Sequence, residues 1–294
     1  MLETNTEVLH DQAWGLDQRP RSDAALALAN GQIAAAATLR GAAPALAKAA
    51  AAMARSIRSG GTLHYAAAGS SGLMAAADAQ ELGGTFSIPA SQLRIHMAGG
   101  LPTGVDMPGA TEDDTSGLAA DLANLTKDDT VIAVSASGST PYTLAAAKIA
   151  REKRATLIAI ANNPDASLFE GADHPIALAT PPEVLSGSTR MGAGTAQKIA
   201  LNMLSTLMAI ELGHVHDGMM VNVKADNAKL RARTVRMVST IASVKAEAAI
   251  TALAATDGMV KPAVLVAKGL GPDAARALLE TTAGNLRAAL AHIT

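Results

Sequence analysis

Two short segments rich in serine and glycine have the composition of a phosphate-binding loop. One is Gly-Ser-Ser-Gly at 69–72, and the other is Ser-Ala-Ser-Gly-Ser-Thr at 135–140. Glycine lets a backbone approach a ligand closely, and hydroxyls and helix N-terminal amides donate hydrogen bonds to a phosphate. Neither segment has the lysine of a nucleoside-triphosphate loop or the spacing GxGxxG, so a sugar phosphate is favoured over a nucleotide. The alternative is that both segments are ordinary turns and helix caps.

A third hydroxyl-bearing segment and two glutamates also have the residue types of a site. The segment PPEVLSGSTRMGAGTAQK at 181–198 opens a long apolar helix, and its Ser188 and Thr189 either cap that helix or face the same cleft. Glu81 ends the helix-forming stretch after the first loop, and Glu112 follows a strand that ends in glycines. Such a pair of glutamates could transfer protons if burial raises the pKa of one of them. The alternative is that Glu112 lies in a solvated acidic turn.

His214 and His216, beside Asp217, have the spacing of two metal ligands. No third ligand is suggested nearby, and a surface turn after a helix explains the pattern equally well. The chain has no cysteine, which excludes disulfides, thiolate metal sites and cysteine nucleophiles. We therefore expect no metal.

The elements that must position these residues follow from the apolar pattern. Short, nearly continuous apolar runs lie at 62–69, 92–100, 128–135, 155–163 and 174–180, and helix-forming stretches at 73–82, 141–153 and 188–213 alternate with them. This alternation predicts an α/β fold of three layers, αβα, doubly wound around a mostly parallel five-stranded sheet. In such a fold, ligands bind at the carboxyl ends of the strands, where the two loops lie.

The pattern also predicts three parts of the chain. Residues 1–54 form an arm and helices, with two helices over 22–58 broken near Gly41–Pro44; residues 55–239 form the sugar-phosphate-binding domain; residues 240–294 form a small helical domain. Within this last part, the segments that begin at Ala246 and Pro272 repeat each other at an offset of 26 residues, each as helix, glycine turn and helix. The alternative is chance similarity between alanine-rich helices.

Composition narrows the function classes. The chain of 294 residues has a net charge of −2 and is 49% hydrophobic and 2% aromatic. This charge draws the protein neither to nucleic acid nor to an anionic membrane, and so few aromatics disfavour a base-stacking platform. No secretory signal and no apolar run of about 20 residues is visible, so we expect a cytoplasmic protein.

Several segments, in this order and spacing, resemble the N-acetylmuramic acid 6-phosphate etherase family, which has the sugar isomerase (SIS) fold. They are SSGLMAAADAQELGGTF, GATEDD, SASGSTPY, PEVLSGSTRMGAGTAQK and LNMLSTLM. The similarity covers about residues 55–270, and the helical tail looks like the family's small C-terminal domain. The two Ser/Gly loops alone would indicate only an SIS domain, whereas the segment 182–198 together with LNMLST is specific to this family.

The resemblance implies a lyase that cleaves the D-lactyl ether of N-acetylmuramic acid 6-phosphate by elimination and addition, giving N-acetylglucosamine 6-phosphate and D-lactate. It implies no cofactor, a role in cell-wall recycling and a homodimer. Glu81 and Glu112 match the family's two catalytic glutamates; Glu81 would protonate the departing lactyl oxygen and activate the returning water, and Glu112 would move the proton at carbon 2. The residues matching the substrate-binding hydroxyls are Ser70, Ser71, Ser137, Ser139, Thr140, Ser188 and Thr189.

The chain departs from the family at three cationic positions. Leu73 and Ser139 stand where the family usually has arginines, and Gly192 stands where it has a lysine. A charge-assisted hydrogen bond to an anion contributes about 1.5–3 kcal/mol, so these changes bear on how the lactyl carboxylate or the phosphate is held. Two alternatives therefore stay open: an SIS-fold phosphosugar isomerase and a sugar-phosphate-binding regulator without catalysis. Retention of Glu81 and Glu112 favours an enzyme.

Overall fold

The computed structural model describes residues 6–293, which form two compact units. The sheet unit comprises the residues up to Gln80 together with Ser91–Ser205, and the helical unit comprises Glu81–Ala90 together with the residues from Thr206 onward. Helices α3 (Gly69–Phe86) and α6 (Gly192–Glu211) each begin in the sheet unit and end in the helical unit. The domain limits predicted from the sequence stay a prediction; the one at 239/240 falls within helix α7, Ala228–Ala242.

The sheet unit is built on five parallel strands. They are β1 (Leu63–Ala67), β2 (Leu93–Met97), β3 (Thr130–Ser135), β4 (Thr156–Ala161) and β5 (His174–Ala177). Their spatial order is β2-β1-β3-β4-β5, so the chain reverses its direction of travel across the sheet between β1 and β3. The predicted five-stranded parallel sheet is confirmed, and each predicted apolar run contains one strand.

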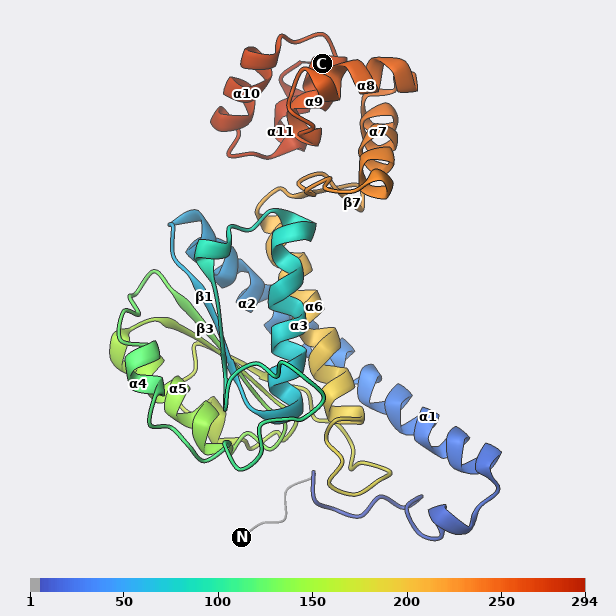
Figure 1. The fold of residues 1–294 in the computed structure, drawn as a ribbon, viewed down its shortest axis with the longest axis vertical. Coiled ribbons are helices and arrows are strands. Elements are labelled where there is room, and N and C mark those ends of the chain that lie inside the picture. The colour runs from blue at the N-terminus through green and yellow to red at the C-terminus, as the bar shows by residue number, and fades with distance from the viewer. Residues whose placement is uncertain (1–5, 294) are drawn as a thin grey trace. The chain divides into compact units, whose positions relative to one another are not determined.

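Helices cover both faces of this sheet, as the near-continuous burial of its central strands requires. Helix α2 (Leu39–Arg58) packs on β1, β3 and β5, whereas α5 (Pro141–Lys153), with the short α4 (Leu118–Asp121) beside it, packs on β1, β3 and β4. Figure 1 shows α4 and α5 on one side of the strands and α2 and α3 on the other. The core on the α5 side is largely alanine and leucine. The predicted three-layer αβα architecture is confirmed.

The N-terminal helices break at a different residue from the predicted one. A 3-10 turn at Leu16–Gln18 precedes α1 (Arg21–Ala37), and α2 begins at Leu39. The break lies at Thr38, whose Oγ1 donates to the carbonyl of Ala35 over 2.8 Å. The prediction of a break near Gly41–Pro44 was wrong, because Pro44 is accommodated in the second turn of α2, where it removes one backbone hydrogen bond without ending the helix.

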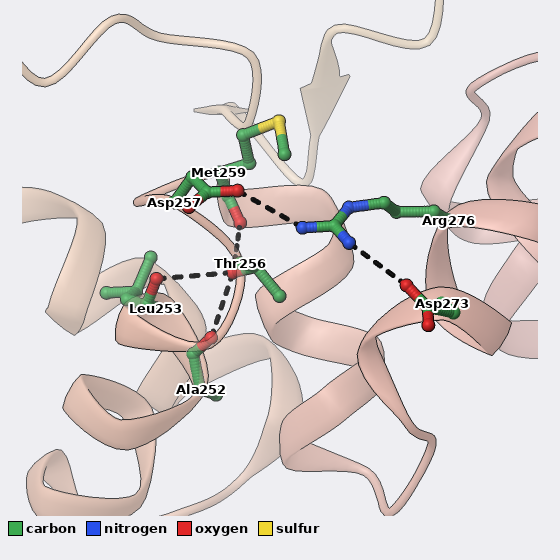
Figure 2. Close-up of polar contacts among 7 residues, drawn as sticks. All are labelled: Ala252, Leu253, Thr256, Asp257, Met259, Asp273 and Arg276. Atoms are coloured by element: carbon green, nitrogen blue, oxygen red, sulfur yellow. Dashed lines mark hydrogen bonds and ion pairs between the residues drawn. The ribbon is translucent and has the colours of Figure 1, made fainter.

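The helical unit contains the predicted repeat. Its helices after α7 are α8 (Ala246–Ala254), α9 (Val260–Ala267), α10 (Pro272–Thr281) and α11 (Leu286–Ala291). Both glycine turns are left-handed, with φ of 76° at Gly258 and 73° at Gly284. In each turn a threonine, Thr256 or Thr282, donates its hydroxyl to the carbonyl four residues earlier, over 2.8 and 2.9 Å; Figure 2 shows the first of these turns. The equivalent bonds confirm that the two segments share one local structure.

The remaining elements are short. They are the 3-10 turns Ala90–Gln92 and Ser167–Phe169, and an antiparallel pair formed by β6 (Val215–His216) and β7 (Met219–Met220). Within residues 6–293, no single helix has both the length and the apolar character needed to cross a membrane.

Candidate active site

A cavity of about 190 Å³ in the sheet unit lies where β1 and β3 end. These neighbouring strands flank the point at which the strand order reverses, the usual place for ligands in an open α/β sheet. The residues lining the cavity are Thr6, Glu7, Ala68, Ser70, Ser71, Glu112, Ala136, Ser137, Thr140, Gly187 and Thr189. The cavity thus combines hydroxyls from four separate segments with two carboxylates, and none of its lining residues within the described part of the chain is a lysine, arginine or histidine.

The second Ser/Gly loop is held in shape by its own hydroxyls. Ser135 Oγ lies 2.8 Å from Thr140 Oγ1 and accepts a hydrogen bond from the Gly138 amide over 2.9 Å. Gly138 has φ of +74°, and a Cβ there would lie 2.2 Å from Cβ of Ala166, so only glycine fits. This arrangement presents Ser137 and Thr140 to the cavity in a fixed geometry before α5 begins at residue 141.

Ser139 has a different place from its neighbours. It is exposed, it is not among the lining residues, and its Oγ donates to Ser137 Oγ over 3.0 Å. Ser188 also lies outside the lining, whereas Thr189 is part of it. Of the seven predicted hydroxyl residues, the structure therefore brings five to the cavity, and Ser139 bonds to one of these five, Ser137.

The first Ser/Gly loop forms the opening turn of α3 and contacts Glu112. Ser71 is buried and Ser70 half-buried, and both line the cavity. A Cβ added to Gly69 would lie 2.7 Å from Glu112 Oε1, so a larger residue at position 69 would require the carboxylate to shift. The free amides of a helix N-terminus attract an anion, which suits both this carboxylate and a substrate phosphate.

Glu112 is placed between the two loops. Its carboxylate faces Gly69 at the start of α3, and its backbone carbonyl accepts a hydrogen bond from the Tyr142 amide in the first turn of α5 over 3.0 Å. The segment after β2 thereby brings a carboxylate to the position where the hydroxyls converge. Glu112 is exposed and lies in a turn, as the alternative of a solvated acidic turn predicts, and it also lines the cavity.

Glu81 does not line this cavity. It is exposed, and it stands on α3 eleven residues after Ser70, which corresponds to about 16 Å along a helix axis. The structure therefore does not bring the two predicted glutamates together in one cavity, and their pairing stays a prediction. His214 and His216 are likewise not in the cavity, and residues 6–293 contain no cluster of three or more potential metal ligands.

Two further carboxylates with defined contacts were not predicted from the sequence. Glu183 is buried, and its Oε2 and Oε1 accept hydrogen bonds from the amides of Gly192 and Ala193 over 2.9 and 2.8 Å. The carboxylate thus caps α6 from nine residues before the helix, outside the spacing of a local capping box. Because it occupies the N-terminus of α6, that helix end is not open to a phosphate.

Glu7 is the second missed carboxylate. It comes from the N-terminal arm, and its backbone carbonyl accepts a hydrogen bond from Ser186 Oγ over 3.5 Å. Its Oε2 lies 3.8 Å from where a Cβ on Gly187 would be, and Thr6 beside it is buried. No local sequence signal indicates this contact, since it joins segments nearly 180 residues apart.

Comparisons with known proteins agree with this geometry. Residues 110–212 match the SIS domain family. The chain is 44% identical over 296 residues to an N-acetylmuramic acid 6-phosphate etherase from Streptomyces avermitilis, covering 99% of this chain and 94% of that one. It is 41% identical over 288 residues to an N-acetylmuramic acid 6-phosphate etherase from Deinococcus radiodurans, covering 97% and 94%.

Among solved structures, a phosphoheptose isomerase from Francisella tularensis aligns with a TM-score of 0.45 and 19% identity, covering 66% of this chain and 98% of that one. The fold class is independently evident from the parallel sheet and its helical layers. Nearly full-length identity of 41–44% to two etherases extends well beyond the SIS domain into the helical unit. The chain belongs to the N-acetylmuramic acid 6-phosphate etherase family.

Proposed function

We propose that this chain is an N-acetylmuramic acid 6-phosphate etherase, a carbon–oxygen lyase that yields N-acetylglucosamine 6-phosphate and D-lactate. The observation that carries the proposal is the cavity at the ends of β1 and β3, where two carboxylates and hydroxyls from four segments converge in a chain 44% identical to an etherase. The family and the site chemistry point to the same substrate class, a phosphorylated amino sugar. We also propose that the enzyme acts in the cytoplasm as a homodimer in cell-wall recycling.

The substrate phosphate binds at the starts of α3 and α5. Ser70 and Ser71 offer hydroxyls beside the free amides of α3, and Ser137 and Thr140 offer hydroxyls just before α5. Two helix dipoles and a ring of donors stabilise a dianion without a side-chain cation. Thr189 adds a donor from the segment before α6, whose own N-terminus is closed by Glu183.

The reaction needs a base and an acid. The base removes the proton on carbon 2 of the open-chain aldehyde sugar, and the electron pair forms a double bond to carbon 3 while the bond from carbon 3 to the lactyl oxygen breaks. The acid protonates that oxygen, and water then adds to carbon 3 while a proton returns to carbon 2. We assign the proton at carbon 2 to Glu112, because its carboxylate lies in the cavity. Glu81 is the proposed acid for the departing lactate.

Release of D-lactate from N-acetylmuramic acid 6-phosphate tests the proposal. The native chain is expected to release it, and Glu112→Gln is expected to lower kcat by about 10²–10⁴-fold, the usual contribution of a general acid or base. Glu81→Gln is expected to lose activity in the same range. Glu152→Gln is the control, since Glu152 is an exposed carboxylate on α5, paired only with Lys148 on the same helix face.

Each outcome decides a separate part of the proposal. If the native chain releases no D-lactate, the etherase assignment is wrong, and an isomerised sugar phosphate among the products would favour the isomerase alternative. If Glu112→Gln keeps the native kcat, Glu112 is not the base. Native activity in Glu81→Gln, with loss in Glu112→Gln, would remove Glu81 from the mechanism and leave the cavity assignment intact.

A further inference from the structure

A second cavity, of about 490 Å³, lies wholly within the helical unit and has no part in the proposed reaction. Its walls come from the loop after β7, from α9 and α10, and from the turn after α3. The lining residues are Ser87, Val221, Asn222, Val223, Met259, Val260, Lys261, Pro262, Arg276, Leu279, Glu280 and Gly284. Most of this surface is apolar, and the polar groups on it are few.

One wall of the cavity is held in place by a short hydrogen-bond network. Ser87 Oγ donates to the carbonyl of Asn222 over 2.6 Å, and Asn222 Nδ2 donates to the carbonyl of Phe86 over 3.0 Å. The loop that carries Val221 and Val223 is therefore fixed against the end of α3. These bonds therefore fix the position of this wall of the cavity.

Lys261 is the unusual member of the lining, because it is a cation with only 8% of its surface exposed. Its Nζ donates to the carbonyl of Gly284 over 2.8 Å, and none of the ion pairs formed within residues 6–293 includes it. Burial lowers the pKa of Lys261 to about 8, so the side chain still carries its proton at neutral pH. An ammonium has three donors, and a buried charge without a counter-ion is costly.

The other charged groups of the cavity are already satisfied or lie in water. Arg276 donates to Asp257 over 3.1 Å and to Asp273 over 3.2 Å, as Figure 2 shows, so two carboxylates balance its charge. Glu280 is exposed, and water screens its effect on a ligand. Lys261 is thus the buried charged group of the cavity, and it has no ion-pair partner among residues 6–293.

We propose that this cavity binds a small organic carboxylate with an apolar body. The carboxylate pairs with Lys261 Nζ, and the body lies on Met259, Val223 and Leu279. A mainly apolar pocket with a small number of polar or charged groups is the usual form of a small-molecule site. The site is separate from the sugar-phosphate cavity, so it does not depend on the proposed function.

Hexanoate, with the neutral hexanamide as its matched partner, tests the proposal on the full chain. Labelling methionine methyl groups with ¹³C gives a local reporter, Met259, whose resonance is identified by its loss in Met259→Leu. Hexanoate at millimolar concentrations is expected to shift this resonance in a saturable way. Hexanamide is expected to bind at least about tenfold more weakly, the effect of losing a charge-assisted hydrogen bond.

Substitutions at Lys261 test whether this side chain binds an anion or only stabilises the turn at Gly284. Lys261→Met is expected to weaken hexanoate binding by about tenfold or more, whereas Lys261→Arg keeps the charge and much of the affinity. Lys268→Met is the control, because Lys268 is exposed at the end of α9 and is not part of the lining. No saturable shift with hexanoate, equal affinity for hexanoate and hexanamide, or unchanged affinity in Lys261→Met would each overturn the proposal. If Lys261→Met does not fold, the comparison of the two probes on the native chain decides.

Discussion

Replacing Glu183 by glutamine should destabilise the sheet unit far more than a typical loss of a surface charge. Both carboxylate oxygens accept backbone amides of α6, at 2.9 and 2.8 Å, and the side chain is buried. Glutamine can accept one of these bonds through Oε1. Its Nε2 group is a donor, however, so it points hydrogens at the other backbone N–H and cannot accept the second bond. The variant therefore loses the charge, loses one hydrogen bond and leaves a buried donor without a partner.

The size of the effect follows from those three losses. A hydrogen bond to a charged group contributes about 1.5–3 kcal/mol, and an unsatisfied buried donor costs about 1–3 kcal/mol. The carboxylate also interacts favourably with the helix dipole, by about 0.3–2 kcal/mol. Because these contributions overlap, we expect Glu183→Gln to lower the free energy of unfolding by about 3 kcal/mol.

Equilibrium urea unfolding, followed by far-ultraviolet circular dichroism, measures this difference. Glu170→Gln is the matched control, because Glu170 is an exposed glutamate in the same unit. Its free energy of unfolding should stay within about 0.5 kcal/mol of the native value. A loss below about 1 kcal/mol in Glu183→Gln would refute the reasoning, since the carboxylate would then not be an essential cap of α6.

Two further predictions concern the sheet unit. Burial, and after it the charge of His96, lowers the pKa of His64 from 6.5 to about 4. Between these two pH values His64 is therefore neutral in the folded state and protonated in the unfolded state. The contribution of His64 to stability is complete above pH 6.5 and is lost as the pH falls toward 4. The free energy of unfolding, measured in urea, should therefore be about 1–2 kcal/mol lower at pH 5 than at pH 7 because of this group. In His64→Gln the difference between the two pH values should be smaller by the same amount. Gly138→Ala should cost about 1–3 kcal/mol and reduce D-lactate release, because its Cβ would overlap Ala166; native stability in that variant would contradict the loop geometry.

The sheet could be predicted because short segments of the sequence mark each of its strands and the loops that follow them. Each strand of a parallel sheet covered on both faces is a nearly continuous apolar run, and each loop that follows one is marked by serine and glycine. The hydroxyls at 70, 71, 137 and 140 therefore reach one cavity simply because β1 and β3 are neighbours and end at the same edge. Ser139 is not in the lining; it is exposed, and its hydroxyl donates to Ser137 within the loop.

The contacts that could not be predicted are those made between distant segments. His64 Nδ1 lies 3.0 Å from His96 Nε2, although the two residues belong to different strands, and their approach depends on the pairing of β1 with β2. Glu7 in the N-terminal arm lines the cavity and contacts Ser186, which lies 179 residues later in the sequence. Neither register nor the path of an arm is encoded in a short motif.

The cap on α6 also accounts for the glycine at position 192, where the family resemblance implied a lysine. A Cβ on Gly192 would lie 3.0 Å from Glu183 Oε2 and 3.2 Å from Cβ of Ala35 in α1, closer than most real Cβ contacts. A lysine at 192 would therefore require α1 or the carboxylate to move. The glycine lets the helix start, its cap and α1 pack this closely, and the charge is lost as a consequence. Phosphate binding then depends more heavily on the two helix starts that remain open, those of α3 and α5, which is where the hydroxyls of the cavity converge.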